Sequence, residues 1–420
     1  MSLRRDLGLL HAVMMGLGST ICAGIFVILS PSVEMAGPAV ILSFLICGII
    51  NMATMLSYCE LGAAMPRLGG EYVYVKAAFK GLPSFITGWY EWSSNIFYAT
   101  LMILGSAYIL SNVTTINEYI IMAALVGIFT LINIKGIKTA GSIQTLLTIA
   151  LLAIIVLFIG AGLAHGFRPN AFEHFMPKGF LGVFAAVAFI FETYVGVEAI
   201  AATQAEIKKP GKTIPRAMIL SSVTLIIIYC LVAYVTIGVI SPDALSKSAT
   251  PLNIVAETTM GSIGVILLTV AGLIAALTSL NSAIIASSRA ACAMGRNGHF
   301  PACLRRVHEN YKTPYLAIVC GSVFIMFFSM IDSLEFVVYS TTFGFLIGFS
   351  LVNLSLIKLR RDKPNMDRPF KTPLYPLTPI IGLATSMILL LFFDVRSLFF
   401  GIFWGLAGCL VYFLRQRAKH

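Results

Sequence analysis

The chain has 420 residues, of which 58% are hydrophobic and only 11% are charged, and its mean hydropathy is +0.91. A soluble domain of this length does not have such a composition, so the sequence predicts an integral membrane protein with little mass outside the bilayer. The formal net charge is +11, but the basic residues are spread over short loops and tails, which argues against nucleic acid as a partner.

Twelve apolar segments follow one another along the chain, each long enough for a helix that spans the lipid bilayer. They cover residues 8–34, 38–63, 83–111, 117–134, 141–164, 179–205, 214–240, 260–292, 314–331, 334–357, 374–393 and 397–414. When the loops are assigned to alternate sides, all but four of the 29 Lys and Arg residues lie on the side of the two termini. The four exceptions are Arg168, Lys178, Lys247 and Arg396. Because basic loops stay in the cytoplasm, we expect both termini to be cytoplasmic.

The first and sixth segments each contain a glycine-bearing stretch with polar residues. The first reads GSTICAGIF (18–26) and the sixth reads FETYVGVE (191–198). A straight helix of about 27 residues would be about 40 Å long, more than the bilayer core needs, so either tilt or a break could use the extra length. The glycines favour a break. Irregular backbone at membrane depth survives only around a buried cavity, so two broken helices point to a transporter's binding site.

The spacing of the two stretches also fits an internal repeat. Residues of about 8–164 and about 179–357 would each hold five segments, and an odd number of segments places the second unit in the opposite orientation. The last two segments, about 374–414, would be appended to this inverted repeat. The expected fold is therefore an all-α integral membrane protein with 12 transmembrane helices, helices 1 and 6 discontinuous, in one domain covering 1–420.

The reactive side chains show no pattern of an enzyme. The eight cysteines and six histidines have no metal-ligand spacing, and no nucleophile–base pair is visible. The polar residues gather at the two expected breaks and do not form the continuous path that a channel would need. We expect neither a cofactor nor a metal, and no chemistry on the substrate.

Several motifs resemble those of the amino acid–polyamine–organocation (APC) transporters, amino acid permease type, along nearly the whole chain. They are GSTICAGIF (18–26), YCELG (58–62), PRLGGEY (66–72), GVE (196–198), EIKKPGKTIPRA (206–217), SR (288–289) and MGRNGHFP (294–301). The resemblance implies a LeuT-type fold and secondary active transport of amino acids across the plasma membrane by alternating access. It also implies coupling to an ion, with a proton expected, by symport or exchange. The alternative is a transporter or exchanger of polyamines or other cationic amines.

The resemblance and the chemistry of the breaks together suggest how a zwitterion would bind. The start of a half-helix is partially positive and its end partially negative. The substrate carboxylate should meet the N–H groups of Cys22, Ala23 and Gly24. The ammonium should meet backbone carbonyls at four positions: Thr20, Ile21, Glu192 and Val195. Phe191 and Tyr194 are aromatic candidates for a gate. The alternative for the glycines is tight helix packing.

The chain departs from the family pattern at Cys22-Ala23, where a Gly-Ser or Gly-Gly pair is usual, and at Glu192, where an aromatic residue is common. A carboxylate at that depth is unfavourable and usually functional. Glu192 could pair with a cationic substrate, titrate and couple transport to protons, or bond a structural neighbour. For Glu198 we favour a structural or coupling role over contact with the substrate.

A third departure concerns the fifth segment. Several proton-coupled and exchanging relatives carry a lysine there, at a position that falls near Leu151, but residues 141–164 contain no lysine. A sodium ion could take the place of that cation. It would be held by carbonyls of the first segment and by hydroxyls of Thr278, Ser279 or Ser282, although such hydroxyls often bond their own helix.

Overall fold

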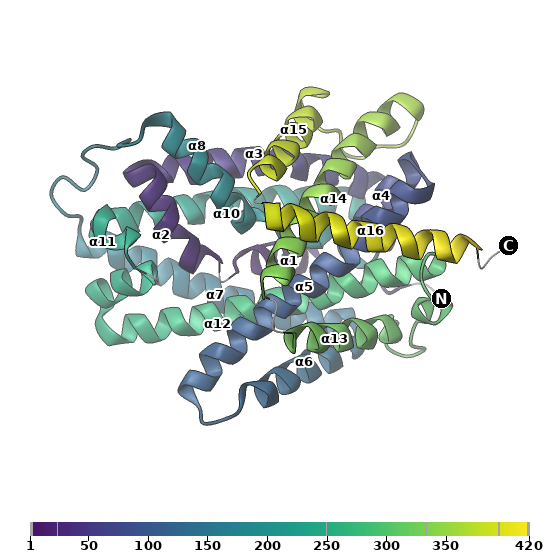
Figure 1. The fold of residues 1–420 in the computed structure, drawn as a ribbon, viewed down its shortest axis with the longest axis horizontal. Coiled ribbons are helices and arrows are strands. Elements are labelled where there is room, and N and C mark those ends of the chain that lie inside the picture. The colour runs from purple at the N-terminus through teal and green to yellow at the C-terminus, as the bar shows by residue number, and fades with distance from the viewer. Residues whose placement is uncertain (1–2, 23, 249, 332–333, 394, 418–420) are drawn as a thin grey trace.

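The computed structural model describes residues 3–22, 24–248, 250–331, 334–393 and 395–417 (Figure 1). The helices of the first half are α1 (Leu9–Thr20), α2 (Gly24–Ala36), η1 (Gly37–Ala39), α3 (Val40–Ala64), α4 (Gly70–Ala78), α5 (Gly81–Val113), α6 (Glu118–Ile134), α7 (Ile137–His165), α8 (Gly179–Ile190), η2 (Phe191–Tyr194) and α9 (Ala199–Ala202). Those of the second half are η3 (Gln204–Glu206), α10 (Pro210–Val239), α11 (Pro242–Ser246), α12 (Pro251–Arg296), η4 (Ala302–Arg305), α13 (Tyr315–Ser329), α14 (Leu334–Asp362), α15 (Leu377–Leu391) and α16 (Val395–Arg417).

The described residues are mainly helical, and their isolated β-bridge joins Leu7 to Ile207. Each of the twelve expected segments coincides with one helix or with a run of short ones. Within the described parts of the chain, eight helical stretches are long and apolar enough to cross a membrane, and four more apolar helices have 10–17 residues. The expectation of an all-helical membrane protein is therefore confirmed.

Several boundaries differ from the sequence prediction, and the starts of α7 and α12 show why. Helix α7 begins at Ile137, before the expected residue 141, and α12 begins at Pro251, before the expected residue 260. Polar residues in the first turns hid both starts, because tertiary packing and not apolar periodicity holds those turns. Proline fits the first turn of a helix, and Gly261, with φ +67°, marks a kink inside α12.

The short helix α4 lies between α3 and α5. It follows Gly69, whose φ of +108° is typical of glycine. Its side chains Tyr72 and Tyr74 are completely buried, and α4 packs against α5 and α14. It is therefore part of the protein interior, and this burial positions the carboxylate of Glu71 inside the bundle.

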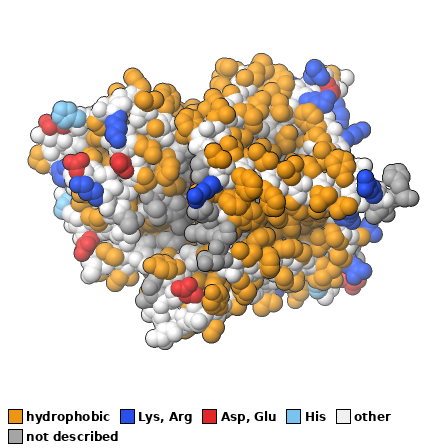
Figure 2. Space-filling view, in the orientation of Figure 1, with side chains coloured by type: hydrophobic (Ala, Val, Ile, Leu, Met, Phe, Trp, Pro, Cys, Tyr) orange, Lys and Arg blue, Asp and Glu red, His pale blue; other side chains and the backbone are white. Residues whose placement is uncertain are grey.

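Both termini lie at the same end of the molecule, which we call the termini end (Figure 1). Figure 2 shows hydrophobic side chains over the middle of the visible face, whereas Lys and Arg gather towards the termini end. Leu181, Leu391 and Val395 are exposed by 83%, 81% and 83%. Such a wide apolar surface is a liability in water but is the surface that faces lipid in a membrane protein.

Candidate functional site

The first segment is broken in its middle. Helix α1 ends at Thr20, Ile21 has non-helical dihedrals (φ −73°, ψ 83°), and α2 resumes at Gly24. The N–H of Cys22 donates to the carbonyl of Thr20 at 2.8 Å, and Ala23 lies outside the described residues. The N–H of Gly24 donates to the sulfur of Cys22 at 3.3 Å. Because a thiol is a weak acceptor, the N–H of Gly24 is the easier of these two donors for a ligand to take over.

The sixth segment is broken as well. Helix α8 tightens into η2 (Phe191–Tyr194), Val195 is extended, and Gly196 has φ +140° before α9 begins at Ala199. The N–H of Gly196 donates to Oε2 of Glu198 at 2.8 Å. The Glu198 carboxylate thus satisfies a backbone group that the break leaves without a helical partner.

The two breaks lie in contact. A Cβ atom placed on Gly196 would be 2.6 Å from Oγ1 of Thr20 and 2.7 Å from the carbonyl carbon of Ser19. The hydroxyl of Tyr229 in α10 lies 3.2 Å from the carbonyl oxygen of Thr20 and 3.0 Å from that of Thr193. One side chain therefore bonds the irregular backbone of both segments.

A cavity of about 300 Å³, the central cavity, opens beside the breaks. It is lined by Cys22, Gly24, Ile28, Tyr98, Leu101, Met102, Glu192, Thr193, Val195, Thr341, Thr342 and Phe345. Most of these side chains are apolar, and Glu192 is the carboxylate among them. A mainly apolar cavity with a few polar groups is the usual form of a small-molecule site, and this volume is at the lower end of the range for such sites.

Glu192 lies between two cavities. Its Oε1 accepts a hydrogen bond from Thr342 in α14 at 3.2 Å. Glu192, Thr342 and Ile28 line both the central cavity and a second hollow of about 600 Å³, the distal hollow, which reaches Met35 at the far end of α2. The carboxylate therefore has a structural neighbour and also faces the space that a substrate would occupy.

The other expected contacts occupy different places. Thr20 and Ile21 are completely buried, so only their backbone could meet a ligand in the breaks. Tyr194 points away from the central cavity, since its hydroxyl donates to the carbonyl of Phe44 in α3 at 2.8 Å. Phe191 lines the distal hollow. Cys22, Gly24, Glu192 and Val195 are the expected residues that line the central cavity.

The expected site residues did not include the wall that α5 and α14 supply. Tyr98 of α5 donates towards the carbonyl of Ser19 at 3.0 Å and Oγ of Ser279 at 3.3 Å. Phe345 of α14 lines both the central cavity and a smaller neighbouring space. The available signal was the pair Thr341-Thr342 in an otherwise apolar stretch, and it carries no family motif.

Three carboxylates line a small space that Phe345 also lines. Glu71, Glu91 and Glu198 line a space of about 20 Å³, the carboxylate hollow, which shares Tyr98 and Phe345 with the central cavity. This volume holds about one water molecule. Only Glu198 was expected to contribute to function. Glu71 could have been noted because its motif, PRLGGEY, places a carboxylate next to two glycines.

Each of the added carboxylates has a partner. Oε1 of Glu71 accepts the hydroxyl of Tyr58 at 2.6 Å, and Oε2 of Glu91 accepts the N–H of Tyr72 at 2.9 Å in the first turn of α4. Burial raises the pKa of Glu71, because the charged carboxylate loses its hydration in the protein interior. The nearby Glu198 raises this pKa further, because two negative charges repel each other.

The hydroxyls that were expected to hold a cation lie in different surroundings. Oγ of Ser279 lies 3.5 Å from the carbonyl of Gly18 and 3.3 Å from that of Ser19. Thr278 instead donates to carbonyls of its own helix, at 3.0 and 2.9 Å. Oγ of Ser282 is buried without a hydrogen-bond partner among the described residues. Leu151, near the expected lysine position, is fully buried.

Comparison with known proteins identifies the family. The family description for amino acid permeases matches residues 11–402. The chain belongs to the amino acid permease family. The chain is 27% identical to the branched-chain amino acid permease BcaP of Bacillus subtilis (strain 168), and the match covers 100% of this permease and 94% of that protein.

Two other relatives from the same organism show how varied the named substrates are. The permease is 26% identical to the serine/threonine exchanger SteT, with 99% of this chain and 98% of the relative covered. It is also 26% identical to the methylthioribose transporter, with 100% and 95% covered. The family is one of multi-pass membrane transporters and not of enzymes.

A buried ion pair joins α12 of the permease to the segment that follows α9. Arg289 of α12 binds Glu206 through two contacts of 3.1 Å, and both side chains are completely buried. The carbonyl of Glu206 also accepts the N–H of Leu7 at 3.0 Å. Since Glu206 and Arg289 come from two of the family-like motifs, those motifs join the segments before α1 and after α9 to α12.

Proposed function

We propose that the permease is a secondary active transporter of small neutral amino acids across the plasma membrane, working by alternating access with both termini in the cytoplasm. The observation that carries the proposal is the contact between two helix breaks beside a cavity of about 300 Å³. The fold would be the LeuT-type arrangement of two inverted five-helix repeats, about 8–164 and about 179–357, with α15 and α16 appended in one domain.

The backbone of the breaks supports a zwitterionic ligand. The N-terminal end of α2 carries a partial positive charge, and the N–H of Gly24 is held only by a sulfur atom 3.3 Å away. A carboxylate there would gain a charge-assisted hydrogen bond. The ammonium would then face the carbonyls at the end of α1 and in η2, at Thr20, Ile21, Glu192 and Val195.

The remaining wall of the cavity supports a neutral side chain. Leu101, Met102 and Phe345 are apolar and lie opposite the breaks in the same cavity. Desolvating a charged side chain against them would be unfavourable unless Glu192 paired with it. The names of two relatives, for branched-chain amino acids and for serine and threonine, agree with a small neutral substrate.

Glu192 keeps a second candidate open, namely a cationic amine. It is the carboxylate of the central cavity and has one hydroxyl partner there, Thr342. A diamine could bind between this carboxylate and the carbonyls of the breaks. In that case Glu192→Gln would abolish binding of the amine, whereas transport of a neutral amino acid would retain its substrate profile.

For ion coupling we infer a proton. The carboxylate hollow and the central cavity share Tyr98, Val195 and Phe345 as lining residues. Protonation of Glu71, Glu91 or Glu198 would therefore change the charge next to the space that the substrate would occupy. Sodium at Ser279 and Ser282 is the alternative, and Thr278 contributes least to it because its hydroxyl bonds its own helix.

The test is binding and uptake of radiolabelled amino acids by purified protein in proteoliposomes, with pH or sodium gradients imposed. Gly24→Pro removes the N–H but keeps a residue that suits the start of a helix. A hydrogen bond to a charged group contributes about 1.5–3 kcal/mol, so we expect binding to weaken by about tenfold or more.

The matched control is Gly24→Ala, which adds a Cβ atom but keeps the N–H. We expect it to bind the amino acid nearly as well as the natural chain, because its nearest contact would be the Cys22 sulfur at 3.2 Å. Equal binding by the proline and alanine variants would contradict the carboxylate site. Competition by diamines but not by amino acids would favour the second candidate.

A further inference from the structure

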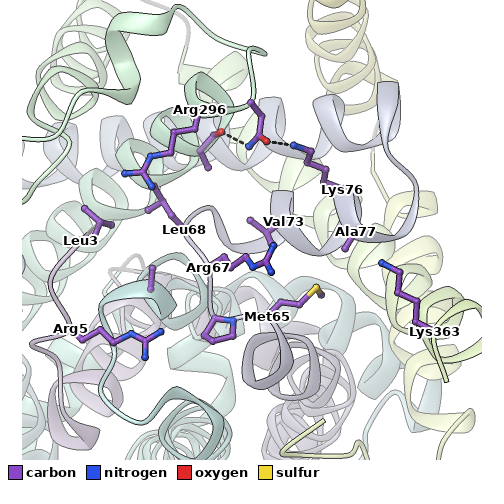
Figure 3. A pocket seen from close by; sticks show the side chains of 14 residues that line it. Leu3, Arg5, Met65, Arg67, Leu68, Val73, Lys76, Ala77, Arg296 and Lys363 are labelled. Carbon is purple, nitrogen blue, oxygen red and sulfur yellow. Dashed lines mark hydrogen bonds between the residues drawn. The ribbon is translucent and has the colours of Figure 1, made fainter. Parts of the chain in front are cut away.

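A large hollow at the termini end is lined by cations. It has a volume of about 630 Å³, and its basic side chains are Arg5, Arg67, Lys76, Arg296 and Lys363 (Figure 3). We call it the basic hollow. No Asp or Glu is among its described lining residues. It also shares no lining residue with the carboxylate hollow, so it is a separate space.

The five cations come from five different parts of the chain. Arg5 precedes α1, Arg67 lies between α3 and α4, and Lys76 is in α4. Arg296 ends α12, and Lys363 follows α14. The fold therefore gathers these charges, since none of them is a sequence neighbour of another. Like charges around one hollow repel each other and create a positive potential there.

Acidic side chains near the basic hollow are already paired with other cations. Asp6 binds Arg4 at 3.2 Å, and Asp362 binds Lys358 at 2.6 Å and Arg361 at 3.2 Å. Lys76 donates to Oδ1 of Asn297, a neutral group that leaves the lysine charge uncompensated. The positive potential of the hollow is therefore not cancelled by a carboxylate of its own wall.

We propose that the basic hollow is a binding site for a phosphate-bearing anion. Phosphate suits it because guanidinium groups bind phosphate oxygens in pairs and lysine adds a point charge. The hollow is larger than the central cavity and also has apolar walls at Leu3 and Leu68, so it can hold more than a bare ion. The phosphate could belong to a soluble molecule or to the headgroup of an anionic lipid.

The experiment measures anion binding to the full chain in lipid nanodiscs without any amino acid present. In phosphatidylcholine discs, pyrophosphate is titrated by calorimetry at low and high salt. In a second arm, discs containing phosphatidylglycerol are used, and lipid that stays bound is counted by native mass spectrometry. Saturable pyrophosphate binding indicates a soluble ligand, and retained phosphatidylglycerol without pyrophosphate binding indicates a lipid headgroup.

The deciding comparison uses two double variants that remove the same net charge. Arg67→Gln with Lys363→Gln acts on the basic hollow, whereas Lys178→Gln with Lys247→Gln acts on exposed lysines outside it. All four side chains are exposed, so the fold should persist. We expect the first pair to weaken anion binding at least tenfold and the second pair to change it less than twofold.

Absence of binding in both arms, or equal loss in both double variants, would overturn the proposed site. Neither result depends on transport, because substrate binding is measured separately through Gly24. A permease that transports amino acids but ignores phosphate would therefore refute this site and leave the proposed function untouched.

Discussion

Cys22 has two roles at the residue scale. Its sulfur accepts the N–H of Gly24 at 3.3 Å, and its side chain, 7% exposed, lines the central cavity. A substrate carboxylate at the start of α2 would compete with this sulfur for the same N–H, and oxygen is the better acceptor. The thiol would then be covered by the ligand, which makes it a natural reporter of occupancy.

We therefore predict that a transported amino acid protects Cys22 from a small methanethiosulfonate reagent. At saturating substrate, the labelling rate of the peptide that contains Cys22 should fall about tenfold or more, measured by mass spectrometry. Cys303 is exposed and lies outside the central cavity, so its labelling in the same sample is the control. If the labelling rate of Cys22 is the same with and without saturating substrate, the substrate binds elsewhere.

The site residues that could be predicted from the sequence are those inside the breaks. Cys22, Gly24, Glu192 and Val195 belong to stretches whose composition is unusual for a membrane helix, so the chain itself marks them. Tyr98 and Phe345 could not be assigned to the cavity from the sequence, because they lie on regular helices, α5 and α14. Only the packing of those helices decides which of their many apolar and aromatic faces meets the cavity.

At the element scale, the contact between the breaks depends on Gly196. Its φ of +140° is a conformation that other residues rarely adopt, and the backbone of Ser19 and Thr20 leaves no space for a Cβ atom. The hydroxyl of Tyr229 can reach both breaks only while they stay this close. The geometry of the two breaks thus depends on one glycine.

We predict that Gly196→Ala destabilises the protein by about 1–3 kcal/mol or more, through backbone strain and the clash with the end of α1. Gly105→Ala is the matched control, because Gly105 lies within α5 and a Cβ atom there would contact nothing within 4 Å. That change should be neutral or slightly stabilising, since alanine favours helices. The measurement is the thermal unfolding of both variants in detergent, followed by size-exclusion chromatography. Equal melting temperatures would refute the strain argument.

Helix positions followed from the sequence because the bilayer demands long apolar segments. The boundaries of α12 and the burial of α4 did not follow. Residues 251–259 are partly polar, and they continue α12 because they pack on neighbouring helices. The segment of α4 has an amphipathic pattern in the sequence, yet its side chains Tyr72 and Tyr74 are fully buried. In each case tertiary packing outweighs the local pattern.

At the scale of the whole molecule, a series of spaces runs from the distal hollow through the central cavity to the carboxylate hollow. Outside this series, the buried pair of Arg289 and Glu206 joins α12 to the segment after α9. A buried pair is seldom a large source of stability, but a single unpaired member would be very unfavourable. Under the proposed alternating access, the pair would suit a contact that is either fully formed or fully replaced.

Proton binding by the interior should make the stability of the whole molecule depend on pH. Burial raises the pKa of Glu71 above its ordinary value, which is about 4.3. Between the ordinary and the raised value, the folded state holds a proton on Glu71 that the unfolded state has lost. The free energy of unfolding therefore falls as pH rises through this window, and the contribution is complete below the ordinary value.

We predict that Glu71→Gln flattens this decline, because the amide keeps an acceptor for the hydroxyl of Tyr58 but does not titrate. The measurement is the melting temperature of both proteins from pH 4.5 to 8.5, with Glu257→Gln as the control because Glu257 is exposed and no hydrogen bond of its side chain would be lost. Glu91 and Glu198 share the carboxylate hollow, so a residual slope should remain in the variant.

If the variant and the natural chain lose stability in parallel, Glu71 is not the group that takes up the proton. Loss of the slope together with loss of pH-driven uptake would instead tie the same proton to the transport cycle.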